Sequence, residues 1–153
     1  MNNPITIAID AMGGDNSPDK VIEGIKLHSN TSKNVNYKIF GIKDLINPLI
    51  NKHEISKERF ELIHTENIVL GEDTALSAAK RGKDTSLWLA VESLKNNNAQ
   101  AIVSAGNTGA LFLISKLNLK MIENIDKPAL SALWPNKKGM SVVLDLGANI
   151  ECS

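Results

Sequence analysis

Short apolar runs alternate along this chain with longer stretches whose apolar residues recur at helical spacing. Ile5–Asp10, residues 35–42 and Phe60–His64 are rich in β-branched or aromatic residues, as strands are. Ala101–Ser104 and residues 141–146 continue the series farther along the chain. Strands separated by helices predict a layered α/β fold with a mostly parallel sheet and helices on both faces.

Helical segments are predicted in the intervals between these strands. Ser17 and Pro18 are expected to open the first helix, with Ser17 as its cap and Pro18 in its first turn. Val21 and Ile25 then lie along one face of that helix. Further helices are expected over residues 44–52, where Pro48 disturbs the pattern, from Thr74 to Gly82, from Thr85 to the asparagines at 96–98, and over residues 110–119.

The last part of the chain carries two extended segments around a polar turn. Residues 129–134 and 141–146 are typical of strands, and the sequence PNKKG at 135–139 is typical of a turn. These two strands either extend the parallel sheet or form a hairpin of their own.

Three segments place small or acidic residues directly after an apolar strand. They are IAIDAMGGD at residues 7–15, AIVSAGNTG at 101–109 and VVLDLGAN at 142–149. In open α/β sheets, ligands bind outside the carboxyl ends of the strands. We therefore expect the three loops to converge on one edge of the sheet and to form a site there.

The loop at residues 104–109 has the composition of an anion site. It precedes a helix, whose first N–H groups have no partner within the helix and carry the positive end of its dipole. Gly106 and Gly109 have no β-carbon to keep a phosphate oxygen away, and Ser104, Asn107 and Thr108 could add side-chain donors. The alternative is a tight strand-to-helix turn in which Thr108 caps the helix. The spacing matches neither of the two common glycine patterns that bind nucleotides.

Three aspartates, Asp10, Asp15 and Asp145, end or follow the strands of these segments. They could bind Mg²⁺, or they could accept hydrogen bonds from loop amides and so fix the shape of the site. Because no second acidic residue stands beside any of them, we favour the structural role and predict neither a metal nor a cofactor.

The basic segment KRGKDTS, residues 80–86, either ends a helix in solvent or binds an anion. In the second case Arg81 would bind the anion through its planar guanidinium group, and Lys83 would attract it as a point charge. The spacing of the three histidines does not pair any of them with a serine or cysteine nucleophile. The chain has no G-x-S-x-G sequence, the motif typical of serine hydrolases. Cys152 is the only cysteine, which excludes an internal disulfide.

Composition and charge narrow the class of protein. A chain of 153 residues, of which 42% are hydrophobic, fits a single globular domain. Its 17 basic and 17 acidic residues balance, so we expect no nucleic-acid partner. The amino terminus shows no charged leader before an apolar segment, and no apolar stretch could span a bilayer, so we expect a cytoplasmic protein.

Five segments, in this order and spacing, resemble the bacterial phosphate acyltransferase family known as PlsX. They are IAIDAMGGDNSP, KRGKDTS, AIVSAGNTGAL, DKPALSALWP and VVLDLGANIEC, and the resemblance runs over essentially the whole chain. Members of that family are much longer, so residues 1–153 are expected to be the amino-terminal part of a single α/β domain whose carboxyl-terminal half is absent. Many relatives carry histidine where this chain has Asn16.

The resemblance implies a homodimer with a fold similar to that of isocitrate dehydrogenase and phosphotransacetylase. It implies a transferase that moves a fatty acyl group from acyl-acyl-carrier-protein to inorganic phosphate and yields acyl-phosphate for phospholipid synthesis. The product would pass to a membrane glycerol-3-phosphate acyltransferase, with which the protein could associate at the membrane surface.

Such a reaction needs no protein nucleophile, because a phosphate oxygen attacks the thioester and the protein holds the dianion and stabilises the oxyanion. We expect the phosphate to be bound by Ser104, Gly106, Thr108, Gly109, Arg81, Gly13, Gly14 and Asp15. Asn107, Asn149 and Lys83 are the candidate catalytic residues, and Asp10, Asp145 and Gly147 are expected to shape the site. Two alternatives stay open. One is a non-catalytic phosphate-binding fragment, and the other is an ATP-dependent sugar-kinase-like phosphotransferase, whose D-x-G turn DLGAN faintly resembles.

Overall fold

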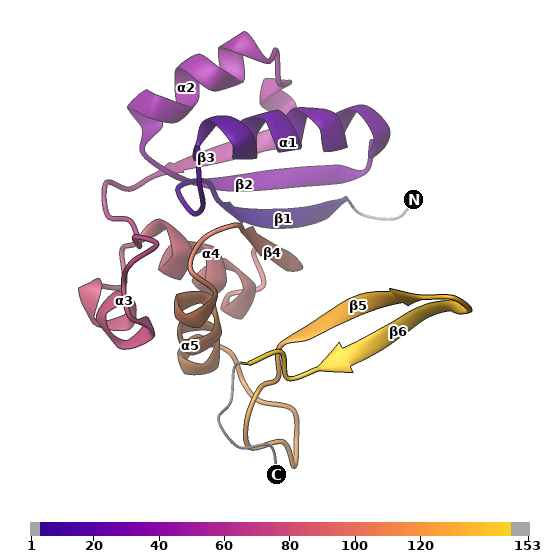
Figure 1. The fold of residues 1–153 in the computed structure, drawn as a ribbon. Helices are drawn as coiled ribbons and strands as arrows, with labels where there is room; N and C mark the ends of the chain where they lie inside the picture. The colour runs from indigo at the N-terminus through magenta and orange to yellow at the C-terminus, as the bar shows by residue number, and fades with distance from the viewer. Residues whose placement is uncertain (1–3, 148–153) are drawn as a thin grey trace. The chain divides into compact units, whose positions relative to one another are not determined.

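The computed structural model describes residues 4–147 and divides the chain into two compact units, residues 1–119 and residues 120–153 (Figure 1). The first unit contains β1 (Ile5–Asp10), α1 (Asp19–Thr31), β2 (Val35–Gly41), α2 (Lys43–Lys52), the short 3₁₀ helix η1 (Lys57–Arg59), β3 (Phe60–His64), α3 (Ala75–Arg81), α4 (Ser86–Lys95), β4 (Ala101–Ser104) and α5 (Thr108–Asn118). The second unit contains β5 (Ser131–Asn136) and β6 (Gly139–Leu144).

The first unit is built on a four-stranded parallel sheet in the order β3-β2-β1-β4. β1 lies inside the sheet, where Ile9 pairs with Ile39 of β2 on one side and with Val103 of β4 on the other. β2 and β3 are added one after the other in one direction, whereas β4 returns to the opposite side of β1.

Helices cover both faces of this sheet (Figure 1). On one face α1 and α2 bury the apolar side chains that alternate along β1 and β2, with Ile22 and Ile46 fully buried between the layers. On the other face α4 packs against Ala8 of β1. α3 and α5 pack with α4 around Val91 and Ile114. The prediction of a layered, parallel α/β fold is confirmed.

The predicted starts of two helices, α3 and α4, are confirmed. Thr74 and Thr85 are the N-caps of α3 and α4, and their hydroxyls accept hydrogen bonds from backbone N–H groups in the first turns. α2 continues through Pro48, although a proline inside a helix removes one backbone hydrogen bond and its ring crowds the carbonyl of the preceding turn.

The expected cap of the first helix was wrong. α1 begins at Asp19 with Pro18 at its N-cap, and no side chain caps it. The Ser17 hydroxyl donates instead to the Gly13 carbonyl oxygen at 2.5 Å. Ser17 therefore closes the glycine loop that precedes the helix.

The second unit is a β-hairpin, so the hairpin alternative is the correct one. β5 and β6 pair antiparallel, with Leu133 opposite Val142 and Asn136 opposite Gly139. This two-stranded sheet is separate from the parallel sheet of the first unit. Its large apolar side chains are exposed on both strands, namely Leu133, Trp134, Met140, Val142 and Leu144. A two-stranded hairpin with no further cover is only marginally stable in water.

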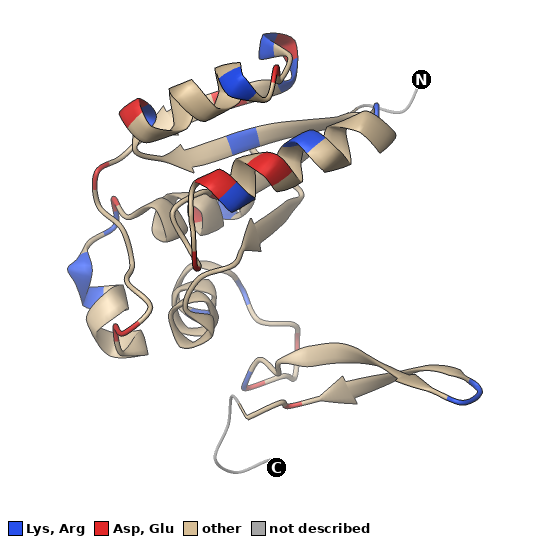
Figure 2. Cartoon of the chain, turned by 45° about the horizontal axis from the view of Figure 1, so that its top comes forward, with Lys and Arg blue, Asp and Glu red and all other residues tan. Residues whose placement is uncertain are grey.

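Charged side chains of both signs are interspersed over the first unit (Figure 2). On α1, Lys20 pairs with Glu23 at 3.1 Å, and Asp19 pairs with Lys52 of α2 at 3.5 Å. The strands of the hairpin carry no charged residue. Neither sign dominates among the coloured residues of the first unit in this view.

Candidate functional site

The order of the strands reverses between β1 and β4, and two of the three glycine-bearing loops leave the sheet there. β1 leads through residues 11–18 to α1 on one face, whereas β4 leads through residues 105–107 to α5 on the other. At such a switch point the loops diverge from the carboxyl ends of adjacent strands and leave a crevice between them. The structure thus brings the first and second of the predicted loops together.

A buried carboxylate joins these two loops. Asp10 ends β1 and is only 3% exposed. Its Oδ2 accepts a hydrogen bond from the Ser104 hydroxyl at 2.8 Å, and its Oδ1 accepts one from the Met12 N–H at 3.3 Å. Ser104 Oγ in turn accepts a hydrogen bond from the Gly106 N–H at 3.2 Å. The Gly106 amide is therefore engaged within the chain and is not a free donor for an anion.

Glycine is required where the two loops touch. A β-carbon on Gly13 would lie 2.6 Å from Asp10 Oδ2 and 2.9 Å from the Gly106 nitrogen. Gly14 has a φ of +95°, which strains any other residue, and a β-carbon there would lie 2.5 Å from the Ala105 carbonyl oxygen. These small residues allow one main chain to pack directly against the other.

Asn107, and not Thr108, caps α5. Asn107 Oδ1 accepts a hydrogen bond from the Ala110 N–H at 2.9 Å. Its Nδ2 donates to the carbonyl oxygens of Gly71 at 3.0 Å and Asp73 at 2.7 Å. The side chain of Asn107 therefore starts the helix and ties it to the segment that follows β3.

Three backbone donors stay free at the start of α5. The N–H groups of Asn107, Thr108 and Gly109 have no hydrogen-bond partner within residues 4–147. They lie at the positive end of the helix dipole, which favours an anion. Of the residues in this loop, Gly106 is thus no free backbone donor, whereas residues 107–109 are.

A cavity of about 350 Å³ lies beside this helix start. The loops after β1 and β4 line it with Gly14, Asp15 and Asn107, among others, and residues 68–71 form a further wall. The sequence analysis missed this wall, because Ile68-Val69-Leu70 is an apolar run with no chemistry of its own. The available signal was its position after β3, at the same edge of the sheet as the other strand ends.

The KRGKDTS segment holds this wall at both ends. Arg81 forms an ion pair with Asp73, and Asn67 Nδ2 donates a hydrogen bond to Asp84 Oδ2 at 2.6 Å. The Thr65 hydroxyl donates to the Asp84 carbonyl oxygen. Arg81 therefore acts on the site indirectly, because its ion pair with Asp73 anchors one end of the wall.

The carboxylate of Asp73 is stabilised in its charged form. The Leu70 N–H donates to it at 2.8 Å and, despite some desolvation, this hydrogen bond together with Arg81 and Ser77 holds the pKa of Asp73 below its ordinary value. A carboxyl with a depressed pKa stabilises the folded state above its unfolded pKa, and this contribution is lost as the pH falls through the folded pKa.

Replacing Asp73 by Asn should therefore lower the urea midpoint of unfolding at pH 7, because Arg81 loses its partner. The difference from the unmodified chain should shrink steadily below about pH 4, as the native carboxyl takes up its proton. Urea titrations between pH 7 and pH 3 measure it, with Glu72→Gln, which removes the exposed neighbouring carboxylate, as the matched control. A difference that is constant over this range would contradict the role given to Asp73.

Of the remaining predicted residues of the first unit, one lines the cavity and the others lie outside its lining. Asp15 lines it and is exposed, and Thr108 and Gly109 form the first turn of α5. Lys83 is exposed in the turn between α3 and α4 and is not among the residues that line this cavity. The parts assigned to these residues in binding and catalysis stay predictions.

The third predicted loop follows the hairpin. Asp145 and Gly147 both have positive φ, 57° and 80°, and the Gly147 N–H donates to the Asp145 carbonyl oxygen at 2.9 Å. Asn149 lies outside the described residues. Because β6 is not a strand of the parallel sheet, the convergence expected for this loop stays a prediction.

Two further features bear on the chemistry. Within residues 4–147, no three His, Cys, Asp or Glu side chains gather as a metal site would require. None of the helices in this part of the chain combines the length and the apolar run needed to cross a bilayer.

Comparison with known proteins identifies the relatives of this chain. It is 62% identical over 153 residues to the phosphate acyltransferase of Pelagibacter ubique, and this match covers the whole chain and 45% of the relative. It is 44% identical over 151 residues to the phosphate acyltransferase of Parvibaculum lavamentivorans, covering 98% of the chain and 42% of the relative. For the phosphate acyltransferase of Rhodospirillum rubrum the identity is 41%, over 100% of the chain and 44% of the relative.

The chain thus spans less than half the length of these relatives, and it corresponds to their amino-terminal half. The resemblance noted in the sequence is confirmed at the level of the family. Residues 5–153 match the model of a family described as fatty acid synthesis protein, and the chain therefore belongs to that family.

Proposed function

We propose that this chain is the phosphate-binding part of an acyltransferase that moves a fatty acyl group from acyl-acyl-carrier-protein to inorganic phosphate. The observation that carries the proposal is the set of three free backbone donors at the start of α5, beside a cavity lined by strand-end loops. The relatives named phosphate acyltransferase support the same chemistry.

The phosphate binds to the N–H groups of Asn107, Thr108 and Gly109. The helix dipole and charge-assisted hydrogen bonds favour the dianion there. Gly109 supports this placement, because a β-carbon on it would meet neighbouring atoms only at ordinary contact distances, 3.4 Å from Asn107 Oδ1 and 3.5 Å from Ala75 Cβ. Contacts within the chain therefore do not require glycine at 109, whereas close approach of a phosphate oxygen to the main chain would.

The reaction needs one bond to form and one to break. A phosphate oxygen attacks the thioester carbonyl, the carbon–sulfur bond breaks, and the carrier-protein thiolate leaves and takes up a proton. The products are acyl-phosphate and the free thiol of the carrier protein. The chain contributes by holding the nucleophile in position and by stabilising the developing oxyanion.

The proposed roles follow the contacts of each residue. Ser104 and Asp10 hold the two loops together, and Arg81 supports the wall and adds positive charge. Both amide hydrogens of Asn107 are donated within the chain, so we place its side chain as a positioning group. Lys83 and Asn149 are the proposed stabilisers of the oxyanion.

For the complete protein we propose a cytoplasmic homodimer without a cofactor. It would associate with the membrane surface and deliver acyl-phosphate to a glycerol-3-phosphate acyltransferase. The non-catalytic alternative applies to the 153-residue chain taken alone, because it spans less than half of its relatives. The names of the relatives, phosphate acyltransferase, do not support the ATP-dependent alternative.

The proposal is tested by Thr108→Pro. Proline is well suited to the first position of a helix, and Asn107 before it already has an extended backbone, with φ −64° and ψ 113°. The substitution therefore removes one free N–H and leaves the helix intact. Phosphate affinity of the 153-residue chain, measured by titration calorimetry, should fall roughly 10- to 100-fold with an unchanged midpoint of unfolding.

The matched control is Thr108→Ala, which removes the hydroxyl and keeps the N–H. It should retain phosphate affinity within about threefold, since only a weak neutral donor is lost. Equal affinity for phosphate in Thr108→Pro and the unmodified chain would refute the proposed site. Phosphate-dependent release of carrier-protein thiol, measured with and without the remaining part of the Pelagibacter relative, separates the catalytic from the non-catalytic alternative.

A further inference from the structure

One face of the edge strand β4 is left uncovered by the helices of the first unit. Val103, which faces the same side of the sheet as Ile9, is 52% exposed. On the opposite side of β4, Ile102 packs against the layer formed by α4. The exposure of β4 is therefore one-sided and lies next to α1.

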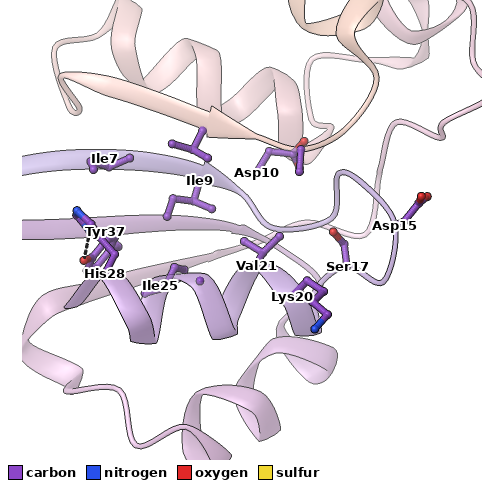
Figure 3. A pocket seen from close by; sticks show the side chains of 13 residues that line it. Ile7, Ile9, Asp10, Asp15, Ser17, Lys20, Val21, Ile25, His28 and Tyr37 are labelled. Carbon is purple, nitrogen blue, oxygen red and sulfur yellow. Dashed lines mark hydrogen bonds between the residues drawn. The ribbon is translucent and has the colours of Figure 1, made fainter. Parts of the chain in front are cut away.

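An apolar groove runs between α1 and β4 on this side. Its cavity has a volume of about 420 Å³ and is lined along its length by Ile7, Ile9, Val21, Ile25 and Val103. Figure 3 shows the labelled isoleucines and Val21 lying between β1 and α1. An apolar groove of this length would be an unusual surface to leave in water.

Among the described residues that line the groove, the polar side chains lie at its two ends (Figure 3). At one end His28 Nδ1 and the Tyr37 hydroxyl are hydrogen-bonded at 2.8 Å. At the other end lie Asp10, Asp15, Ser17 and Lys20. The described lining residues between these ends are apolar, so a surface that fits them must itself be an apolar stripe.

The sheet indicates the kind of element that fits. β4 is a parallel strand whose second edge is unpaired within residues 4–147. Parallel sheets are covered by helices on both faces, and here α1 and α2 already cover β1 to β3 on this side. A helix beside α1, over Val103, would continue that layer.

We infer that this groove seats an amphipathic helix from the carboxyl-terminal half of the complete protein, together with a strand on the open edge of β4. The relatives provide such a segment, because more than half of the Pelagibacter protein lies outside the region that this chain matches. The inference rests on family membership and does not depend on phosphate binding.

Cysteine labelling tests the inference. The protein is this chain joined to the remaining part of the Pelagibacter relative, with Cys152 and the other cysteines replaced by serine, and it is compared with the 153-residue chain alone. Val103→Cys should react with a thiol reagent at least tenfold more slowly in the joined protein than in the short chain. Leu27→Cys, on α1 outside the groove and 64% exposed, is the control and should react at the same rate in both.

Equal reactivity of Val103→Cys in both proteins would overturn the inference. Slower labelling of the short chain at higher protein concentration would assign the groove to a second copy, and slower labelling only when acyl-carrier protein is present would assign it to the acyl group. Each of these results also overturns it. If the joined protein lacks a cooperative unfolding transition, the remaining part is co-expressed as a separate chain. Protection of Val103→Cys then supports the inference, and its absence overturns it.

Discussion

Gly13→Ala is expected to lower the free energy of unfolding by about 3 kcal/mol, at the upper end of what overpacking a tight site costs. The added β-carbon would lie 2.6 Å from Asp10 Oδ2 and 2.9 Å from both the Gly106 nitrogen and Ser104 Oγ. These atoms belong to the hydrogen-bonded chain that joins the two loops, so they can yield only by separating the loops. A loss of this size is a large share of the stability of a typical domain. Urea unfolding followed by circular dichroism measures it.

The matched control is Gly24→Ala in α1, where an added β-carbon would meet no atom within 4 Å. Alanine is favoured over glycine inside a helix, so this variant should gain about 0.5–1 kcal/mol. The opposite signs of the two glycine substitutions separate a steric requirement from a general effect of removing glycine. An unfolding midpoint for Gly13→Ala equal to that of the unmodified chain would show that the loops are not in contact.

Asn107→Ala is expected to lower the free energy of unfolding by about 2–4 kcal/mol. It removes the cap of α5, which contributes about 1 kcal/mol, and two hydrogen bonds to the carbonyl oxygens of Gly71 and Asp73, each of similar size. Because Asn107 holds the wall of the cavity, phosphate affinity should fall in parallel. Chemical unfolding and titration calorimetry on the same samples give the two quantities.

Asn107→Ser divides this effect into its two parts. Serine can accept the hydrogen bond from the Ala110 N–H as a cap, but it is too short to reach both carbonyl oxygens of the wall. It should therefore recover about 1 kcal/mol of the loss and leave the wall unsupported. If Asn107→Ser restored the full stability of the chain, the contacts of Asn107 with Gly71 and Asp73 would have no energetic weight.

Much of the fold could be predicted from the periodicity of the chain. The strands around Ile9 and Ile39 were recognisable because both are rich in β-branched or aromatic residues, and the helix starts at Thr74 and Thr85 followed from local capping. The start of α1 was predicted wrongly because Ser17 has a second partner, the Gly13 carbonyl oxygen, which no local rule reveals.

The candidate site was predictable only in part. The free amides at the start of α5 follow from a glycine-rich loop between a strand and a helix, and the loop around Gly13 was recognised in the same way. The wall at residues 68–71 was missed, since its part in the site depends on Asn107, Arg81 and Asp84, which lie elsewhere in the chain. The role of two glycines also differs from the one predicted. Gly13 and Gly106 allow the two main chains to pack against each other, rather than admitting a phosphate oxygen.

The sequence by itself determined the elements, because the spacing of apolar residues and the caps are local properties of the chain. It also determined the family, because the short segments around the strand ends are specific in their order. Only the tertiary structure decided which donors are free. Asp10 and Ser104 are 94 positions apart. The Ser104 hydroxyl donates to Asp10, and its oxygen in turn accepts from the Gly106 N–H, which leaves the amides of residues 107–109 as the free set. Such a selection depends on which loops meet in space, and no local pattern encodes it.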